Sequence, residues 1–236
     1  FDIHGMSGMR PRPKREIPNP PICWRYSGTP KAVRCQEAAL DEAAFTAAHV
    51  MNFNVNIPGV FIFSSGKNMG VFKGVGYPED MGRFFRLEEY AATCWTAHGR
   101  YPTNTPGWWG GAHPFTLLDY SVVHNGEISS YDANRRYMEM FGYRCTLQTD
   151  TEVITYIADY LLQRQGLTLE ELASVIAAPF WSTIRTREPD AARQLTYLRT
   201  VYPSLLITGP FSIILGFNGR LMALTVLWPA STSCKT

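Results

Sequence analysis

The residues best suited to acyl-transfer chemistry gather between positions 98 and 150. Arg100 follows a predicted strand at residues 93–98, and its planar guanidinium suits two-point binding of a carboxylate. Asn125 and Gly126 end another predicted strand and precede a predicted helix. The amide side chain and the glycine N–H can therefore point donors at one spot, the arrangement that stabilises an oxyanion.

Each of these residues also has an ordinary structural interpretation. Arg100 could pair with a structural carboxylate or lie at the surface. Asn125 and Gly126 could form a type I′ hairpin turn, although no pairing strand follows them directly. Asp150 stands at the start of a predicted helix, where an acid complements the helix dipole.

Metal and cofactor sites find little support in the sequence. Cys94 and His98 are spaced to share a strand face, but a buried thiol near a structural histidine is the better interpretation. No further Cys or His follows at metal-ligand spacing. The glycines at 74 and 76 lack the third glycine of a dinucleotide fingerprint. We therefore expect neither a metal nor a cofactor.

The elements that must position these residues follow from the hydrophobic pattern. Strands are predicted at 120–124, at 93–98, as a hairpin at 60–64 and 71–75, and as a second hairpin at 212–217 and 221–225. Helices are predicted at 129–141, after capping boxes at 149–152 and 168–171, and from Pro189 to Tyr202. Strands, then helices, then strands predict a sheet that carries helices on one face.

Composition limits the class of protein and its organisation. The chain has 236 residues, of which 45% are apolar and 18% charged, which excludes a disordered chain and a coiled coil. A net charge of +2 favours neither a nucleic acid nor a membrane as partner. Five cysteines without framework-like spacing and no apolar run of about 20 residues indicate a cytoplasmic protein. We expect a proline-rich arm at 1–30 without regular helix or central strand, one domain at 31–226 and an irregular tail at 227–236.

Four motifs, in this order, resemble the glutaminase domain of class II glutamine amidotransferases. They are His-Gly-Arg-Tyr-Pro-Thr at 98–103, Ala-His-Pro-Phe at 112–115, Val-Val-His-Asn-Gly-Glu-Ile at 122–128 and Gln-Thr-Asp-Thr-Glu-Val-Ile at 148–154. Residues 19–26 further resemble the archaeal-type amidotransferase subunit or domain of glutamate synthase. The resemblance implies an α+β fold, the αββα sandwich of the N-terminal-nucleophile hydrolases.

The resemblance also implies a role for each site residue. Arg100 would bind the α-carboxylate of glutamine and Asp150 its α-ammonium, while Asn125 and Gly126 would form the oxyanion hole. Thr103 and His113 would line or support the pocket. One cation and one anion at fixed separation are what an amino acid zwitterion requires.

The family nucleophile is a cysteine at the mature N-terminus, whose own amino group acts as base. Residue 1 is Phe, and none of the five cysteines has that context. We therefore expect a fragment that lacks the nucleophile-bearing segment and is inactive as it stands.

Three functions remain open at this point. The first is a complete protein that hydrolyses glutamine to glutamate and ammonia for a glutamate-synthase-like subunit or domain. The second is a non-catalytic glutamine-binding or structural subunit of such a complex. The third is an unrelated α+β binding domain whose motifs coincide by chance.

Overall fold

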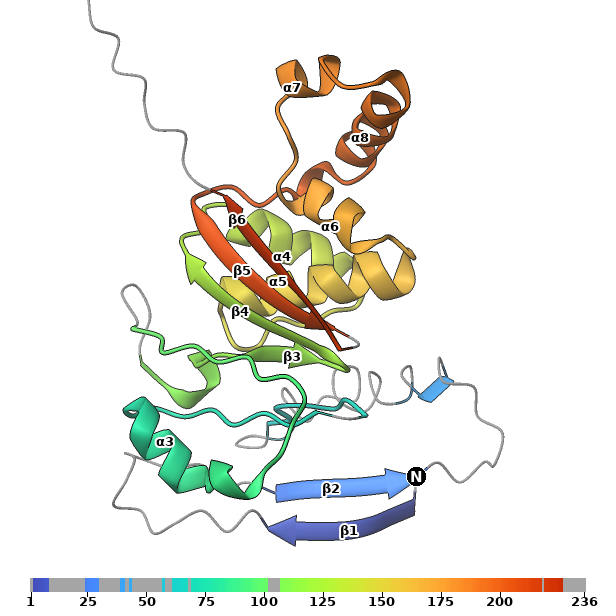
Figure 1. Ribbon diagram of the computed structural model, residues 1–236. Helices are drawn as coiled ribbons and strands as arrows, with labels where there is room; N and C mark the ends of the chain where they lie inside the picture. Colours follow the sequence, from blue (N-terminus) through green and yellow to red (C-terminus); the bar gives the residue numbers. More distant parts are fainter. Residues whose placement is uncertain are drawn as a thin grey trace, which may run out of the picture.

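The computed structural model describes residues 2–8, 24–29, 39–40, 43, 57, 61–67, 69–101, 107–217 and 219–226. A four-stranded antiparallel sheet forms its centre, in the order β3-β4-β5-β6 (Figure 1). The strands are β3 (Phe115–Leu117), β4 (Tyr120–Gly126), β5 (Phe211–Phe217) and β6 (Arg220–Val226). β5 pairs with β4 although residues 127–210 separate them, so the chain leaves the sheet and returns beside the strand that it left.

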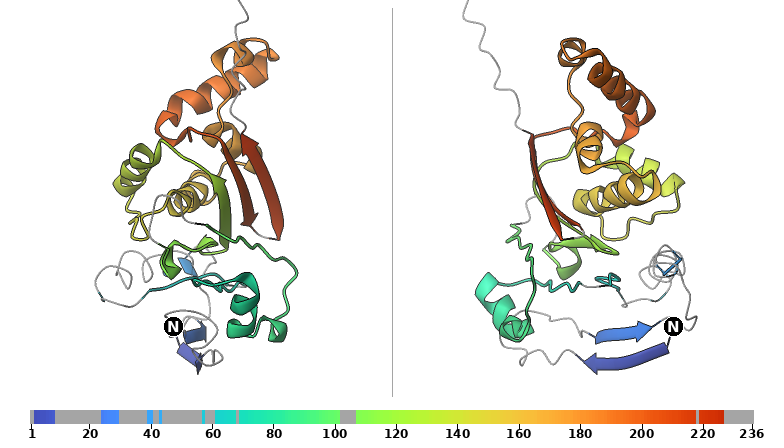
Figure 2. Two further views of the ribbon diagram at one scale, coloured as in Figure 1. Left: turned by 90° about the vertical axis from the view of Figure 1, so that its left-hand side faces the viewer. Right: turned by 45° about the vertical axis from the view of Figure 1, so that its right-hand side comes forward.

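Three helices cover one face of this sheet, as predicted (Figures 1 and 2). They are α4 (Tyr131–Met140), α5 (Asp150–Asp159) and α6 (Leu169–Ile176). Every residue of α5 from Thr151 to Asp159 is buried, because the helix lies between the sheet and its neighbours. The core between the layers includes Val122, Ile157, Leu172, Ile213 and Leu215.

The remaining elements lie around this two-layer unit. α7 (Trp181–Arg185) and α8 (Pro189–Val201) project beyond α6, while α3 (Pro78–Phe85) lies beyond β3 (Figure 1). Phe84 and Phe85 form a small core of their own with Phe72. Short 3-10 turns occur at Leu87–Glu89, Trp109–Gly111 and Pro203–Leu205, and a π-helical turn at Tyr160–Arg164 extends α5. Among the described residues, every helix falls short of the length and apolarity that crossing a bilayer requires.

Predictions that rested on local capping and turn signals are confirmed. α4, α6, α8 and the β5–β6 hairpin lie where the sequence predicts them. The capping box of α6 is complete, since Thr168 accepts from the amide of Glu171 and the Glu171 carboxylate accepts from the amide of Thr168. At α5 only half of the box forms. Thr149 caps the helix, but the Glu152 carboxylate accepts from the amides of Thr146 and Leu147 instead.

Two strand predictions are wrong within the described residues. Residues 61–67 and 69–75 form no ladder, and side chains from β3 and the turn after it bond to backbone groups of Phe63 and Lys67 instead. The Thr116 hydroxyl donates to the carbonyl of Phe63, and Asp119 accepts from the amide of Lys67. Residues 93–98 form no strand either. The segment that contains Thr96 crosses the sheet face that lacks helices. There the Thr96 hydroxyl lies 2.8 Å from that of Ser121.

The structure describes part of the predicted arm and none of the predicted tail. Within the arm, β1 (Asp2–Gly8) and β2 (Trp24–Thr29) pair as a two-stranded antiparallel ribbon, which contains no central strand. The prolines from 11 to 21 and the tail at 227–236 lie outside the described residues. The predicted domain boundaries therefore remain predictions.

Candidate active site

The end of β4 carries the two residues predicted to bind an oxyanion. Asn125 is exposed and lies opposite Ser212 in the ladder with β5. Gly126 has φ +146°, and a Cβ at this position would lie 2.3 Å from the carbonyl oxygen of Pro210. Only glycine fits this close approach. After Gly126 the amide of Glu127 donates to the carbonyl of Pro210, and the chain then enters α4. Asn125 and Gly126 therefore form a strand-to-helix junction and no hairpin turn.

Asp150, the first residue of α5, contacts the histidine that precedes Asn125. Its Oδ1 lies 3.5 Å from Nδ1 of His124 and 3.2 Å from the hydroxyl of Thr151, which donates to it. The β4 strand and the N-terminus of α5 thus bring the acid beside the predicted oxyanion-binding junction. The first-turn position of Asp150 also suits the helix dipole, and the two roles are compatible.

His113 joins the same cluster from the segment before β3. Its Nε2 lies 3.0 Å from the Thr151 hydroxyl oxygen, which in turn lies 3.3 Å from Nδ1 of His124. The ring of His98 packs against that of His113, with centroids 4.5 Å apart. Three histidines from separate segments therefore surround the start of α5, and His113 and His124 are buried.

The surroundings keep the acid ionised and His113 neutral. Burial acts to raise the pKa of Asp150, but the contacts with His124 and Thr151 outweigh it and leave the pKa below its ordinary value. Burial above all, and then the positive charges that its neighbours can carry, lower the pKa of His113 to about 3. At neutral pH the cluster therefore presents a carboxylate beside an uncharged imidazole.

Arg100 is half-buried and connects to the cluster through the backbone. Its Nη1 donates to the carbonyl oxygen of Gly111 at 3.3 Å, two residues before His113. The structure thus brings Arg100, His113, Asn125, Gly126 and Asp150 into one connected region between β4, α5 and the segment leading to β3. Thr103, the remaining predicted site residue, lies outside the described residues.

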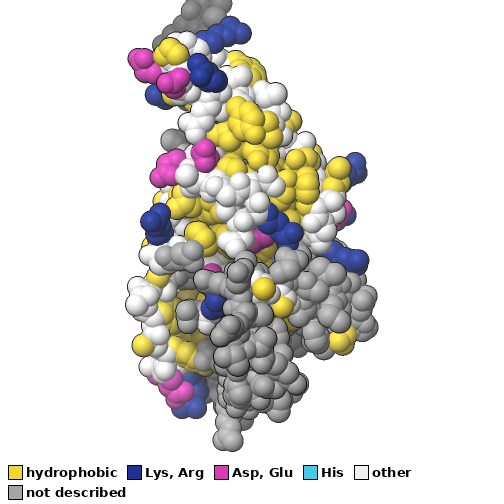
Figure 3. Space-filling view, turned by 90° about the vertical axis from the view of Figure 1, so that its right-hand side faces the viewer, with side chains coloured by type: hydrophobic (Ala, Val, Ile, Leu, Met, Phe, Trp, Pro, Cys, Tyr) yellow, Lys and Arg dark blue, Asp and Glu magenta, His cyan; other side chains and the backbone are white. Residues whose placement is uncertain are grey.

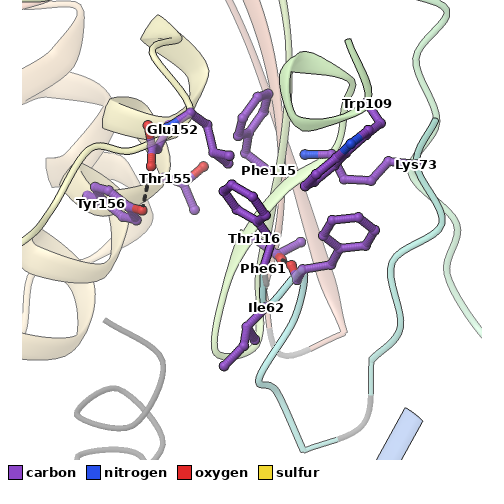
Figure 4. A pocket seen from close by; sticks show the side chains of 11 residues that line it. Phe61, Ile62, Lys73, Trp109, Phe115, Thr116, Glu152, Thr155 and Tyr156 are labelled. Atoms are coloured by element: carbon purple, nitrogen blue, oxygen red, sulfur yellow. Dashed lines mark hydrogen bonds between the residues drawn. The ribbon is translucent and has the colours of Figure 1, made fainter. Parts of the chain in front are cut away.

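A separate cavity lies on the other side of Glu152, and none of the described predicted site residues lines it (Figure 4). The cavity has a volume of about 410 Å³, which includes space open to solvent. It lies between α5 and a group of aromatic side chains that includes Phe61, Trp109 and Phe115. Lys73 is buried there, donates to the carbonyl of Gly110 at 3.2 Å and lies 4.1 Å from the Phe115 ring centroid. Burial lowers the pKa of Lys73 to about 7, against a weaker opposing effect of Glu152.

Sequence reasoning missed three buried polar residues of this region. Thr151 and His124 stand inside the quoted motifs, so the sequence marked their positions as part of the candidate site. It did not indicate which residues they contact. Lys73 stands two residues from the buried Val71 with a half-buried residue between them, a spacing that places both side chains on the same, inward-facing side of an extended chain. Glu152, predicted only as a capping residue, holds residues 146 and 147 in place and accepts from the Tyr156 hydroxyl.

The described cysteines have no features of an activated nucleophile. Cys94 is exposed, and burial followed by the nearby carboxylates of Glu152 and Glu139 raises the pKa of Cys145. Within the described ranges, no three His, Cys, Asp or Glu side chains form a group that could hold a metal ion. The arrangement can therefore recognise an ammonium group and offer oxyanion donors, and the described part supplies no thiolate to attack a carbonyl.

Comparisons with known proteins agree with this chemistry. The family model of class-II glutamine amidotransferases matches residues 30–159, more than half of the chain, and includes all four motifs. An uncharacterized protein of Archaeoglobus fulgidus is 46% identical over 226 residues, which are 95% of this chain and 60% of that protein.

More distant relatives carry names that specify an activity or a family. A glutamine–fructose-6-phosphate aminotransferase (isomerizing) of Acinetobacter baylyi is 33% identical over 118 residues, 50% of this chain and 17% of the relative. The glutamine amidotransferase-like protein GlxB of Rhizobium meliloti is 33% identical over 124 residues, 52% of this chain and 41% of the relative. The chain thus spans only part of each of these relatives, and over its matched region it belongs to the class II glutamine amidotransferases.

Proposed function

We propose that the complete protein hydrolyses the side-chain amide of glutamine and passes the ammonia to a glutamate-synthase-like subunit or domain. The observation that supports this most is the joining of Asp150, kept ionised, to the β4 end that carries Asn125 and Gly126. The relatives' names support glutamine as substrate, and the resemblance of residues 19–26 supports the glutamate synthase type.

In this proposal each residue acts on a different part of glutamine. The Arg100 guanidinium pairs with the α-carboxylate and Asp150 with the α-ammonium, while Thr103 and His113 support the pocket. A terminal cysteine thiolate of the complete protein attacks the amide carbonyl. The oxygen that becomes negative accepts from the Asn125 side chain and the Gly126 N–H. Ammonia then leaves, and water hydrolyses the thioester to glutamate.

We also propose that the complete protein forms the αββα sandwich of its family. The sheet face opposite the helices carries apolar side chains at the surface, Ile214 at 41% and Leu221 at 57% exposure. These two residues share a face because Ile214 is two residues from Gly216, the ladder partner of Leu221. A second sheet on this face would remove them from water.

The Asp150→Asn variant of the complete protein tests the ammonium site. The substitution keeps a polar residue in the first helical turn but removes the charge, so we expect a loss of about 1–3 kcal/mol in glutamine affinity with little change in melting temperature. Calorimetric titration with glutamine measures the affinity, a thermal melt measures the melting temperature, and an assay of released glutamate measures turnover.

Asp190→Asn is the matched control for this experiment. Asp190 is also in the first turn of a helix, α8, but its side chain is 96% exposed, so only its helix-dipole and surface charge effects are lost. If Asp150→Asn and Asp190→Asn behave alike, the acid is only a helix-start residue and the site is wrong. A wild-type protein that binds glutamine without releasing glutamate would instead support the non-catalytic alternative.

A further inference from the structure

One hydroxyl lies at the centre of the candidate site and has no role in the chemistry proposed so far. The Thr151 side chain is 1% exposed, and three polar groups surround its oxygen: His113 Nε2 at 3.0 Å, His124 Nδ1 at 3.3 Å and Asp150 Oδ1 at 3.2 Å. These groups come from three separate segments, so the contact is built by the tertiary fold.

The number of hydrogens decides how this cluster is arranged. A threonine hydroxyl has one hydrogen to donate and two lone pairs to accept with. The carboxylate cannot donate while ionised, and a charged acceptor makes the stronger bond, so the hydroxyl hydrogen goes to Asp150. Both imidazoles must then present a hydrogen to the cluster, His113 to a lone pair of Thr151 and His124 to Thr151 or to the Asp150 carboxylate 3.5 Å away.

We propose that Thr151 is a positioning residue, which orients the Asp150 carboxylate and fixes His113 as its Nε2–H tautomer and His124 as its Nδ1–H tautomer. The role in substrate binding rests on the proposed function, whereas the tautomers do not depend on it. The other ring nitrogens, His113 Nδ1 and His124 Nε2, are then unprotonated, and both are buried without a hydrogen-bond partner among the described residues.

This arrangement has a consequence for the charge of the site. His113 is neutral in this tautomer, so it supports the cluster without adding a cation that would compete with the α-ammonium of glutamine. Both side-chain contacts also use Oδ1 of Asp150. The second oxygen, Oδ2, is the one that we assign to the ammonium.

Nitrogen-15 NMR of histidine-labelled protein tests the tautomers without any substitution. We expect the wild-type chain to show protonated Nε2 for His113 and protonated Nδ1 for His124. The fixed tautomer of His113 should disappear in Thr151→Val, which removes the hydroxyl at nearly constant volume, and should persist in Thr151→Ser. The opposite tautomer at either histidine of the wild type would overturn the proposal.

Kinetics of the complete protein test the effect on substrate. Thr151→Val should raise KM for glutamine about ten-fold, the loss of one hydrogen bond to a charged group, while kcat changes little. Thr151→Ser, which keeps the hydroxyl, should leave KM for glutamine close to wild type. In an Asp150→Asn background Thr151→Val should have no further effect, because its action passes through that carboxylate. Independent, additive effects of the two substitutions would overturn the positioning role.

Thr155→Val is the matched control in both experiments. Thr155 is equally buried one turn further along α5, and its hydroxyl donates only to the backbone carbonyl of Thr151. If it changes the tautomers or KM as Thr151→Val does, the effect is a general disturbance of the helix and the proposal fails. A wild-type protein that neither binds nor hydrolyses glutamine contradicts the proposed function alone, and the tautomers then decide the role of Thr151.

Discussion

At the scale of single residues, three neighbours at the end of β4 have three separate tasks. His124 is buried and contacts Asp150, Asn125 is exposed, and Gly126 has a backbone conformation that excludes a side chain. Because the strand alternates its side chains, a buried and an exposed residue can stand next to each other without conflict. Substitutions at Asn125 should therefore affect chemistry more than folding.

We expect Asn125→Ala in the complete protein to lower kcat by about 10²–10³-fold and to leave KM for glutamine close to wild type. The amide would donate to an oxyanion that exists only after attack on the carbonyl, so its loss affects the transition state. Steady-state kinetics and a melting curve measure both properties. Ser212→Ala, which changes the exposed ladder partner of Asn125, is the control and should keep kcat. A loss of folding with Asn125→Ala and full activity with Asn125→Gly would mean that Asn125 only shapes the backbone.

Lys73 predicts a pH dependence of stability. Its pKa is about 7 in the folded protein and about 10.5 in an unfolded chain, so between these values the unfolded state binds a proton that the folded state does not. The free energy of unfolding should therefore rise with pH over this interval, and the contribution of Lys73 to the slope should disappear in Lys73→Met. Urea unfolding at pH 7, 8 and 9 measures the slope. Lys67→Met, at an exposed lysine, should retain it, and equal slopes in wild type and Lys73→Met would contradict the low pKa.

At the scale of elements, the sequence predicted correctly the helices and turns that are determined by residues close together in the chain. α6 begins at a capping box, and α8 begins at Pro189. Both signals depend only on residues within one turn of the helix start. The strands at 60–64, 71–75 and 93–98 were predicted from β-type composition, but a strand needs a partner. Side chains of Thr116, Asp119 and Ser121 contact these segments in place of a ladder.

The same distinction applies to the candidate site. Motif residues such as Arg100 and Asp150 could be named in advance, because they stand in motifs that resemble the class II family and their charges suit a zwitterion. Thr151 and Lys73 could not be assigned a role, since their contacts come from segments far apart in the sequence. The half-formed capping box of α5 is a further case, in which tertiary contacts redirect Glu152 to residues 146 and 147.

At the scale of the whole molecule, the net charge of +2 is too small to attract a charged partner over a long distance. Figure 3 shows one face on which positive and negative side chains are dispersed, in keeping with a net charge of +2. We expect a partner of this face to be recognised by shape and apolar contact more than by long-range attraction.

We expect the 236-residue chain, assayed as it stands, to release no glutamate from glutamine above background. The described cysteines are an exposed Cys94 and a Cys145 whose pKa is raised, and neither provides a thiolate for the oxyanion site. A coupled glutamate assay at high enzyme concentration measures the activity. Turnover that disappears in Cys94→Ser would show that the nucleophile is misassigned.

The pairing of β4 with β5 sets the order in which the molecule can be completed during synthesis. All the predicted site residues have left the ribosome once residue 150 has emerged, but the partner of Asn125 and Gly126 begins only at Phe211. At about 5–20 residues per second, residues 151–216 require several seconds. During that interval the short β3 is the strand of the described sheet that can pair with β4, and the junction at Gly126 lacks the backbone of Pro210 against which it fits. The end of β4 that we propose to bind the oxyanion is therefore among the last parts of the candidate site to acquire its final shape.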